Sequence, residues 1–503
     1  MQFGVHTKPD PCGTRLEEGS RTRNIIFRIK QTMLKPFYSS LLLVVLACVV
    51  SHISAVHVFD TYRAVQYDKD GEPYGSRKVR VDYLAIAVPN KSPQKKAAEK
   101  TAEGSGKKKK RNLKRLSRNV VVLTMDEASK ETLHDLIFTR KCGALLILIP
   151  SSFKDLSKET LMKWKAVEKW FINMEVTPPL YFSIMDEKLQ NTYDALVQAR
   201  DGSKLQAYDD YRLVSDLVVP KKIDKVKLLN IQGWIAGSSN EPDVDSESLG
   251  TVAIVAHYDT FGAAPGLSRG ADSNGSGVAA LLELSRLFAA LHQSSDSRAP
   301  YNMLFVLTAA GHINYAGSRE WLSNTDAQLL DSIEFALCID SIGHGENLYL
   351  HLSKPRKSPA IKKFLSSFQT TSQNMGINFK SVHKRINLTD PVLAWEHEQF
   401  SLKQIISGTL SHYKKPRSIL SRSSMFDVKE TSINMDILKR NIHFIAESLA
   451  VYMYAPVSFY LCPMTLRYET NFFQTILQTL RFVRFKLIKS YRGHYSRGLL
   501  AWT

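Results

Sequence analysis

The sequence predicts an α/β protein whose main domain is a mixed, largely parallel sheet covered by helices, preceded by a smaller N-terminal α/β module. Three observations support this prediction. The chain has 503 residues, 44% of them hydrophobic, which is enough for more than one core-forming domain. Apolar, partly β-branched runs of strand length alternate with helical patterns over residues 228–455. A shorter series of such runs lies in residues 56–220.

Five runs in the main domain have the length and composition of buried strands. They span residues 251–256, 302–309, 334–340, 347–352 and 405–411. Between the first two, residues 277–291 place Val278, Leu281, Leu284 and Phe288 at helical spacing, which predicts a helix with a broad apolar face. The alternation of strands and helices favours parallel pairing, because a helix returns the chain to the same end of the sheet.

The N-terminal module is predicted from two further strand-like segments. Residues 143–149 form an apolar run that Pro150 ends, and residues 178–184 form another. Residues 93–118 interrupt the module with eleven Lys or Arg against two Glu, beside a Gly-Ser-Gly step, which is typical of a solvated loop. The alternative is that this insert binds acidic lipid or RNA.

The net charge of +19 is concentrated in three short segments. Basic residues gather in residues 21–35, in the 93–118 insert and in residues 481–497, and the rest of the chain is close to neutral. A folded body without a basic face does not have the electrostatic footprint of a nucleic-acid-binding domain. We therefore expect no nucleic-acid partner.

Both ends of the chain have patterns that concern membranes. In residues 1–55, an N-terminal extension leads into an apolar run at 41–50, which follows basic residues and precedes a small-residue step, as in a cleaved secretory signal. An uncleaved signal anchor over residues 37–56 is the alternative. Residues 456–503 form a basic tail with apolar residues at helical spacing, which indicates either an interfacial amphipathic helix or a divergent end.

A secretory signal implies an oxidising, glycosylating compartment. Three cysteines follow the signal: Cys142, Cys338 and Cys462. Their number and spacing indicate neither a disulfide framework nor a metal site. Three asparagines begin Asn-x-Ser/Thr sequons and are candidates for glycosylation: Asn90, Asn274 and Asn387.

Residues of metal-ligand type follow the predicted strands of the main domain, at the sheet edge where α/β proteins bind ligands. His257 and Asp259 follow the first strand, Asp272 lies in the glycine-rich loop 270–277, and Asp340 ends the third strand. A single Asp after a strand is usually a turn or helix-cap residue. Four such residues at one edge indicate a site.

These segments resemble the co-catalytic zinc aminopeptidase family, over about residues 228–455. The resemblance rests on the Ala-His-Tyr-Asp step that contains His257, on the loop 270–277 and on the Cys-Ile-Asp step that ends at Asp340. It implies that His257, the bridging carboxylate Asp272, Asp340 and, within residues 395–400, His397 correspond to metal ligands. Asp259 corresponds to the residue that orients the first ligand.

The resemblance fails at the paired glutamates that supply the family's general base and a metal ligand. Counted from the Gly-Ser step at 317–318, the corresponding residues are Gly311 and His312. Two-metal hydrolysis needs a carboxylate to accept the proton of the attacking water, so we expect a pseudo-peptidase with no catalytic residue and no cofactor. The alternative is an active zinc-dependent aminopeptidase of the secretory pathway, in which His312 coordinates zinc and Glu396 or Glu398 is the base.

Other segments resemble a non-catalytic, nicastrin-related branch of this family. They are residues 58–68, 255–259, 382–388 and 395–398. The resemblance implies a scaffold of the endoplasmic-reticulum membrane whose main domain is lumenal. It also implies assembly with a Nodal modulator-type protein, a small multipass membrane protein and the translocon, where the complex assists insertion of multipass proteins.

Overall fold

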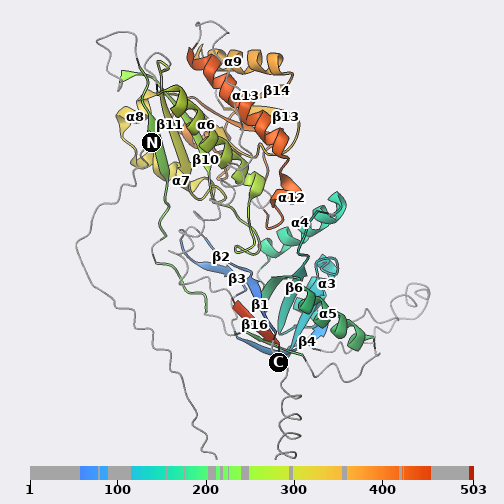
Figure 1. The fold of residues 1–503 in the computed structure, drawn as a ribbon. Coiled ribbons are helices and arrows are strands. Elements are labelled where there is room, and N and C mark those ends of the chain that lie inside the picture. The colour runs from blue at the N-terminus through green and yellow to red at the C-terminus, as the bar shows by residue number, and fades with distance from the viewer. Residues whose placement is uncertain are drawn as a thin grey trace, which may run out of the picture.

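The computed structural model describes two sheets and the helices that pack on them (Figure 1). The described residues are 57–68, 70–76, 80–88, 115–154, 156–174, 176–201, 211–215, 219–224, 226–238, 248–293, 298–353, 359–418, 422, 424–454 and 498–502. The predicted signal region 1–55, Asn90, Cys462, most of the 93–118 insert and most of the 456–503 tail lie outside them. Among the described helices, none combines the length and the hydrophobicity that crossing a membrane requires.

The first sheet closes into a barrel in the order β1-β16-β8-β4-β5-β6-β7. Its strands are β1 (His57–Arg63), β4 (Val81–Ala87), β5 (Asn119–Thr124), β6 (Ala144–Ile149), β7 (Leu180–Ile184), β8 (Arg212–Ser215) and β16 (Gly498–Trp502). Strands β4 to β7 pair in parallel, and β1, β8 and β16 pair antiparallel. The two strands expected in this module are β6 and β7. Within the tail, Gly498–Trp502 form β16, and the segment whose apolar residues have helical spacing lies outside the described residues.

Helices and a small ribbon complete this part of the molecule. They are the ribbon β2 (Val65–Tyr67) with β3 (Pro73–Gly75), helix α3 (Lys130–His134), the π-helical turn η1 (Asp135–Thr139), and helices α4 (Lys158–Asn173) and α5 (Glu187–Arg200). Ser157 caps α4 by accepting a hydrogen bond from the Thr160 amide at 3.1 Å. Helix α4 buries Trp164, Val167 and Phe171, which share one face at helical spacing.

The second sheet has the order β14-β13-β15-β12-β10-β11-β9. Its strands are β9 (Ile231–Ile235), β10 (Thr251–His257), β11 (Asn302–Thr308), β12 (Ile333–Ile339), β13 (Asn347–Leu352), β14 (Asn378–His383) and β15 (Ser407–Ser411). Strands β11, β10, β12 and β15 are parallel, as are β13 and β14, whereas β9 and β13 run antiparallel to their neighbours β11 and β15. The predicted α/β class with a mixed, largely parallel sheet is therefore confirmed.

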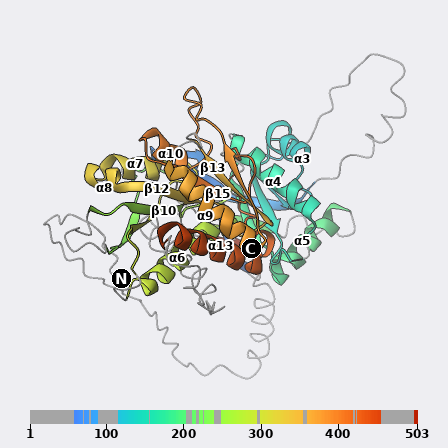
Figure 2. The ribbon, with the colours of Figure 1, turned by 90° about the horizontal axis from the view of Figure 1, so that it is seen from above.

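Helices cover both faces of the second sheet (Figure 2). One face carries α6 (Gly277–Leu291), α9 (Pro359–Met375) and α13 (Met435–Tyr454), and the other carries α7 (Ala316–Asn324), α8 (Ala327–Ser332) and α10 (His397–Leu402). The short π-helical turn η4 (Ala271–Ser276) precedes α6, and α12 (Lys429–Ser432) precedes α13. Every residue of β10 is buried, which explains the unbroken apolar run in its sequence.

Helix α4 packs the N-terminal module against the second sheet's loops. Trp164 lies 5.5 Å from Phe426 between ring centroids, and the same apolar cluster contains Ala263, Ala264 and Leu267 from the loop after β10. Figure 1 shows α4 beside α12, at the junction of the two parts. The two parts of the molecule thus share a core next to the loops that follow β10.

Candidate functional site

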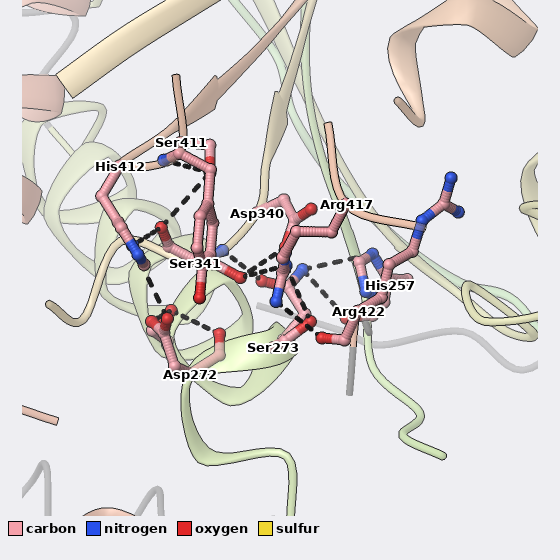
Figure 3. A network of polar contacts seen from close by, with 12 residues as sticks. His257, Asp272, Ser273, Asp340, Ser341, Ser411, His412, Arg417 and Arg422 are labelled. Carbon is pink, nitrogen blue, oxygen red and sulfur yellow. Dashed lines mark hydrogen bonds and ion pairs between the residues drawn. The ribbon is translucent and has the colours of Figure 1, made fainter. Parts of the chain in front are cut away.

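The ends of β10 and β12 bring His257 and Asp340 together in a buried polar network (Figure 3). His257 Nδ1 lies 3.3 Å from Glu396 Oε2. Burial by itself lowers the pKa of His257, but the hydrogen bond to Glu396 and the charges of Glu396, Asp340 and Asp259 outweigh it and raise that pKa. His257 is therefore held through Nδ1 by an internal carboxylate, that of Glu396.

Arg417 supplies a permanent positive charge beside Asp340. Its Nη2 lies 3.3 Å from Asp340 Oδ1 and donates hydrogen bonds to Ser341 Oγ at 2.8 Å and Ser273 Oγ at 3.2 Å (Figure 3). The guanidinium stacks on Tyr413, 4.1 Å from its ring centroid, and the side chain is only 14% exposed. Burial acts to raise the pKa of Asp340, but the Arg417 charge and the smaller effects of His257, Ser341 and Arg422 together outweigh it and lower that pKa. A guanidinium therefore lies beside Asp340, one of the positions that resemble the family's metal ligands.

Asp272 is held by backbone and hydroxyl donors. Its Oδ1 accepts hydrogen bonds from the Gly343 amide at 2.8 Å and Ser276 Oγ at 3.0 Å. The carboxylate of Asp427 in turn accepts from the amides of Asp272 at 3.1 Å and Ser273 at 2.9 Å. Burial and the neighbouring Asp427 raise the pKa of Asp272 to about 7. Asp272 therefore fixes the loop before α6.

Gly311, at the position expected for the general base, lies directly against His257. A Cβ atom added to Gly311 would be 2.3 Å from two carbons of the His257 ring, so no larger residue fits without moving that ring. Asp259 accepts hydrogen bonds from the amides of Ala310 and Gly311, and His312 Nδ1 lies 3.5 Å from its Oδ2. The His312 ring stacks on Phe261 with 5.2 Å between ring centroids. Asp259 thus orients the 310–312 turn.

His397 is separated from the other positions that resemble metal ligands. Its Nδ1 lies 2.8 Å from Thr409 Oγ1 and its Nε2 lies 2.9 Å from Ser353 Oγ, so both ring nitrogens have hydroxyl partners. Burial lowers the pKa of His397 to about 3, which keeps the ring neutral. The expected remnant positions His257, Asp272, Asp340 and His397 are therefore all hydrogen-bonded polar residues, but they do not form one ligand set.

The two glutamates considered as a substitute base have other partners. Glu396 is 0% exposed, and its Oε1 accepts hydrogen bonds from Thr308 Oγ1 at 2.6 Å and Ser318 Oγ at 2.7 Å. Its other oxygen faces His257. Glu398 Oε2 accepts from the Ala394 amide at 2.9 Å. Glu396 is therefore sealed from solvent, whereas Glu398 lies at the wall of a pocket.

The residues present do not fit the pair of zinc ions that the resemblance implies. In the part of the chain that the structure describes, no group of three or more His, Cys, Asp or Glu side chains is arranged to hold a metal ion. The Arg417 guanidinium lies 3.3 Å from Asp340 Oδ1. A divalent metal ion placed beside Asp340 would be repelled by this permanent charge.

Asn274, a candidate for glycosylation from its sequon, is buried in this fold. The side chain is 1% exposed, and its Nδ2, the atom that would carry a glycan, donates to the carbonyls of Ile339 at 2.8 Å and His257 at 3.2 Å. Its Oδ1 accepts from the Ser341 amide at 3.1 Å. Asn274 therefore ties the ends of β10 and β12 together. Asn387, in contrast, is exposed.

Sequence reasoning missed Arg417, Asp427 and the structural role of Asn274. Arg417 follows β15 in a Lys-Lys-Pro-Arg segment, where one more basic residue resembles an ordinary solvated loop. Asp427 lies far from the glycine-rich loop in sequence, and its contact with that loop has no local pattern. The available signal was a polar residue near the end of a strand, and β15 carries one although no recognised motif marks it.

Comparisons with known proteins agree with this geometry. Residues 241–390 match Peptidase family M28. The chain is 35% identical over 418 residues to the human BOS complex subunit NCLN, and the match covers 80% of this chain and 69% of that protein. It is 28% identical over 457 residues to Nicalin of Caenorhabditis elegans, and that match covers 83% of this chain and 73% of that protein. The crystal structure of the gamma-secretase component Nicastrin superimposes with a TM-score of 0.54 at 14% identity, over 79% of this chain and 74% of that one. The expected aminopeptidase-like fold and the nicastrin-related branch are confirmed.

Proposed function

Because this chain belongs to the nicalin family of aminopeptidase-like proteins, we propose that it is a non-catalytic scaffold of a membrane-protein complex in the endoplasmic reticulum. The observation that carries the proposal is the Arg417 guanidinium beside Asp340, with His257 paired to Glu396. These contacts use the remnant ligands as internal hydrogen-bonded partners. A fold whose former metal residues are satisfied by its own side chains retains its shape without zinc.

The chemistry of hydrolysis supports the same proposal. A two-metal peptidase needs a base that accepts a proton from the metal-bound water, and loss of such a base typically reduces the rate by about 10²- to 10⁴-fold. Gly311 has no side chain, Glu396 is sealed from solvent, and His257 occupies the space that a side chain at position 311 would need. No residue of the described site replaces the missing function.

Zinc content and peptidase activity of the purified chain test this proposal. We expect substoichiometric zinc by elemental analysis and no chelator-sensitive hydrolysis of aminoacyl p-nitroanilides, because the Arg417 guanidinium repels a divalent cation beside Asp340. An active zinc aminopeptidase of the same family, assayed in parallel, is the positive control. Stoichiometric zinc together with chelator-sensitive turnover would establish the alternative, an active enzyme.

The partners of the scaffold are proposed from the family. Vertebrate members of the family carry the name BOS complex subunit. We propose that this chain likewise assembles with a Nodal modulator-type protein and a small multipass membrane protein, and that the complex assists insertion of multipass proteins at the translocon. Capture of the tagged chain from detergent extracts, followed by mass spectrometry, should recover both partners. An unrelated tagged lumenal protein serves as control, and recovery of neither partner would contradict the assignment.

A lumenal main domain predicts a glycan at Asn387 and none at Asn274. Asn387 is exposed, and its Oδ1 accepts a hydrogen bond from Thr389 Oγ1 at 2.7 Å, so the sequon is accessible. Asn274 is buried with its amide nitrogen bonded. Peptide mapping after enzymatic deglycosylation should show conversion to aspartate at Asn387 alone of these two, and Thr389→Ala should abolish it. An unmodified Asn387 in the membrane-derived protein would argue against lumenal exposure of this face.

A further inference from the structure

A pocket of about 420 Å³ lies on the face of β13 and β14 beside the start of α10. Its apolar walls come from Leu352, Val382 and Trp395. The Trp395 ring is buried and stacks on His351, with 4.2 Å between ring centroids, so this wall is rigid. The volume is in the range of sites that hold small ligands or a side chain of a partner. We call this cavity the β14 pocket.

The rim of the β14 pocket is basic. Lys384, Lys414 and Lys415 line it, and all three are exposed. None of them takes part in an ion pair found among the described residues, although Lys384 lies close enough to Glu398 to act on its pKa. The Glu398 carboxylate is engaged by the Ala394 amide. Glu398 also lines the pocket and offsets part of the charge of Lys384, but Lys414 and Lys415 leave the rim with an excess of positive charge, which matches an anionic ligand with an apolar centre.

The pocket adjoins a sheet edge. Strand β14 is the terminal strand of the second sheet and pairs, in the described part of the chain, with β13 alone. The Lys384 amide donates to the Leu352 carbonyl at 3.0 Å, so in an extended strand the amide of the preceding residue, His383, points away from β13. Val382 and Lys384 line the pocket from alternate positions of the strand, so they share one face of it.

We propose that β14 and the β14 pocket form a docking site for an extended acidic segment of a partner protein. The segment adds a strand to β14, places an apolar side chain between Val382 and Trp395, and places acidic side chains on the same face beside the rim lysines. Lysines at a sheet edge also discourage pairing between like strands. An acidic strand is the partner that this charge attracts, and the pocket beneath supplies a place for its side chain. The inference extends the proposed scaffold role. It rests on that role only in taking the partner to be a protein.

The probe is a fluorescein-labelled peptide, Ser-Thr-Glu-Thr-Leu-Thr-Glu-Thr-Ser, whose leucine and glutamates share one strand face. Fluorescence anisotropy with the full chain should give a dissociation constant on the order of 10–100 μM. The same peptide with lysines in place of its glutamates should not bind. Hydrogen exchange should slow at the backbone amides of β14 when the acidic peptide is bound, because strand addition uses them.

Two pairs of variants separate the pocket and the edge. Lys414→Glu with Lys415→Glu should weaken binding at least about tenfold, because like charges at an interface repel, whereas Lys169→Glu with Lys188→Glu on α4 and α5 changes the net charge equally and should not. His383→Pro removes an outward amide and should also weaken binding, whereas His383→Val keeps that amide and should bind normally.

Three results would overturn the docking proposal. They are absence of peptide binding, binding that the pocket variants leave unchanged, and binding without protection of the β14 amides. If phosphatidylserine vesicles bind the chain through Lys414 and Lys415 while the peptide does not, the face recognises a membrane and the strand proposal fails. None of these results bears on zinc content or hydrolysis, so the scaffold proposal is tested separately.

Discussion

Arg417→Met is expected to lower the free energy of unfolding by about 3–5 kcal/mol, because it leaves a buried carboxylate without its compensating charge. Asp340 is almost fully buried, which acts to raise its pKa. Of the charges that lower the pKa of Asp340, Arg417 has the largest effect. Methionine approximates the length of the aliphatic part of arginine, so the packing against Tyr413 is largely kept. Chemical denaturation monitored by far-ultraviolet circular dichroism at neutral pH measures the effect.

A double-mutant cycle distinguishes this charge compensation from a loss of packing. Asp340→Asn combined with Arg417→Met removes both charges, so the double variant should be more stable than the sum of the two single effects predicts, by about 1–3 kcal/mol. Arg417→Lys keeps the charge but not the planar guanidinium, so its free energy of unfolding should lie between those of wild type and Arg417→Met. Additive single effects would show that the Arg417–Asp340 pair does not hold the site together.

Under the proposal of a metal-free scaffold, the described network is what holds the loops at the strand ends. In a metal site, the ion neutralises converging carboxylates and orders the loops that carry them. Here the carboxylates are distributed among other partners: Arg417 for Asp340, backbone amides for Asp259 and Asp427, and hydroxyls with His257 for Glu396. Each loop end is therefore tied by hydrogen bonds that form during folding and need no ion.

The sequence predicted the centre of the second sheet because its elements are buried and regular. Helix α6 begins and ends where the apolar spacing indicated, and β10 extends the expected run by one residue, to His257. The edge strands β9 and β14 were not predicted. Their side chains are mostly half-buried or exposed, so their sequences lack the continuous apolar run of a central strand. β14 is the strand on which the docking proposal depends.

The site was predicted less completely than the fold, because its contacts join distant segments. The sequence located His257, Asp259 and Asp340 at or just after the ends of strands and Asp272 in the loop before α6, where the structure places them. It could not show that Glu396 turns toward His257 while the adjacent His397 turns toward Ser353 and Thr409. Neighbouring residues at the start of a helix point in different directions. A motif match does not show which of them points toward His257.

Glu168→Ala is expected to be the second strongly destabilising change, by about 3–5 kcal/mol, because it removes the polar link between α4 and the main domain. Glu168 Oε1 accepts hydrogen bonds from the amides of Ala263 at 3.0 Å and Met425 at 2.8 Å, and its other oxygen accepts from Ser424. Alanine leaves both buried amides without a partner. Because Met425 lies two residues before Asp427, we also expect the loop that Asp427 holds to lose protection in hydrogen exchange.

Glu168→Gln is the matched control and also gives a test by pH. The glutamine oxygen can accept hydrogen bonds from both amides and its nitrogen can donate to Ser424 Oγ, so Glu168→Gln should lower the free energy of unfolding by less than about 1 kcal/mol.

Burial raises the pKa of Glu168 despite these hydrogen bonds. The folded state therefore binds this proton more tightly than the unfolded state does. The stabilisation is complete below the ordinary glutamate pKa of about 4.3 and is lost as pH rises through the raised value. Unfolding free energies measured from pH 4 upward should fall more steeply for wild type than for Glu168→Gln, and parallel curves would show that Glu168 is not buried between the two parts.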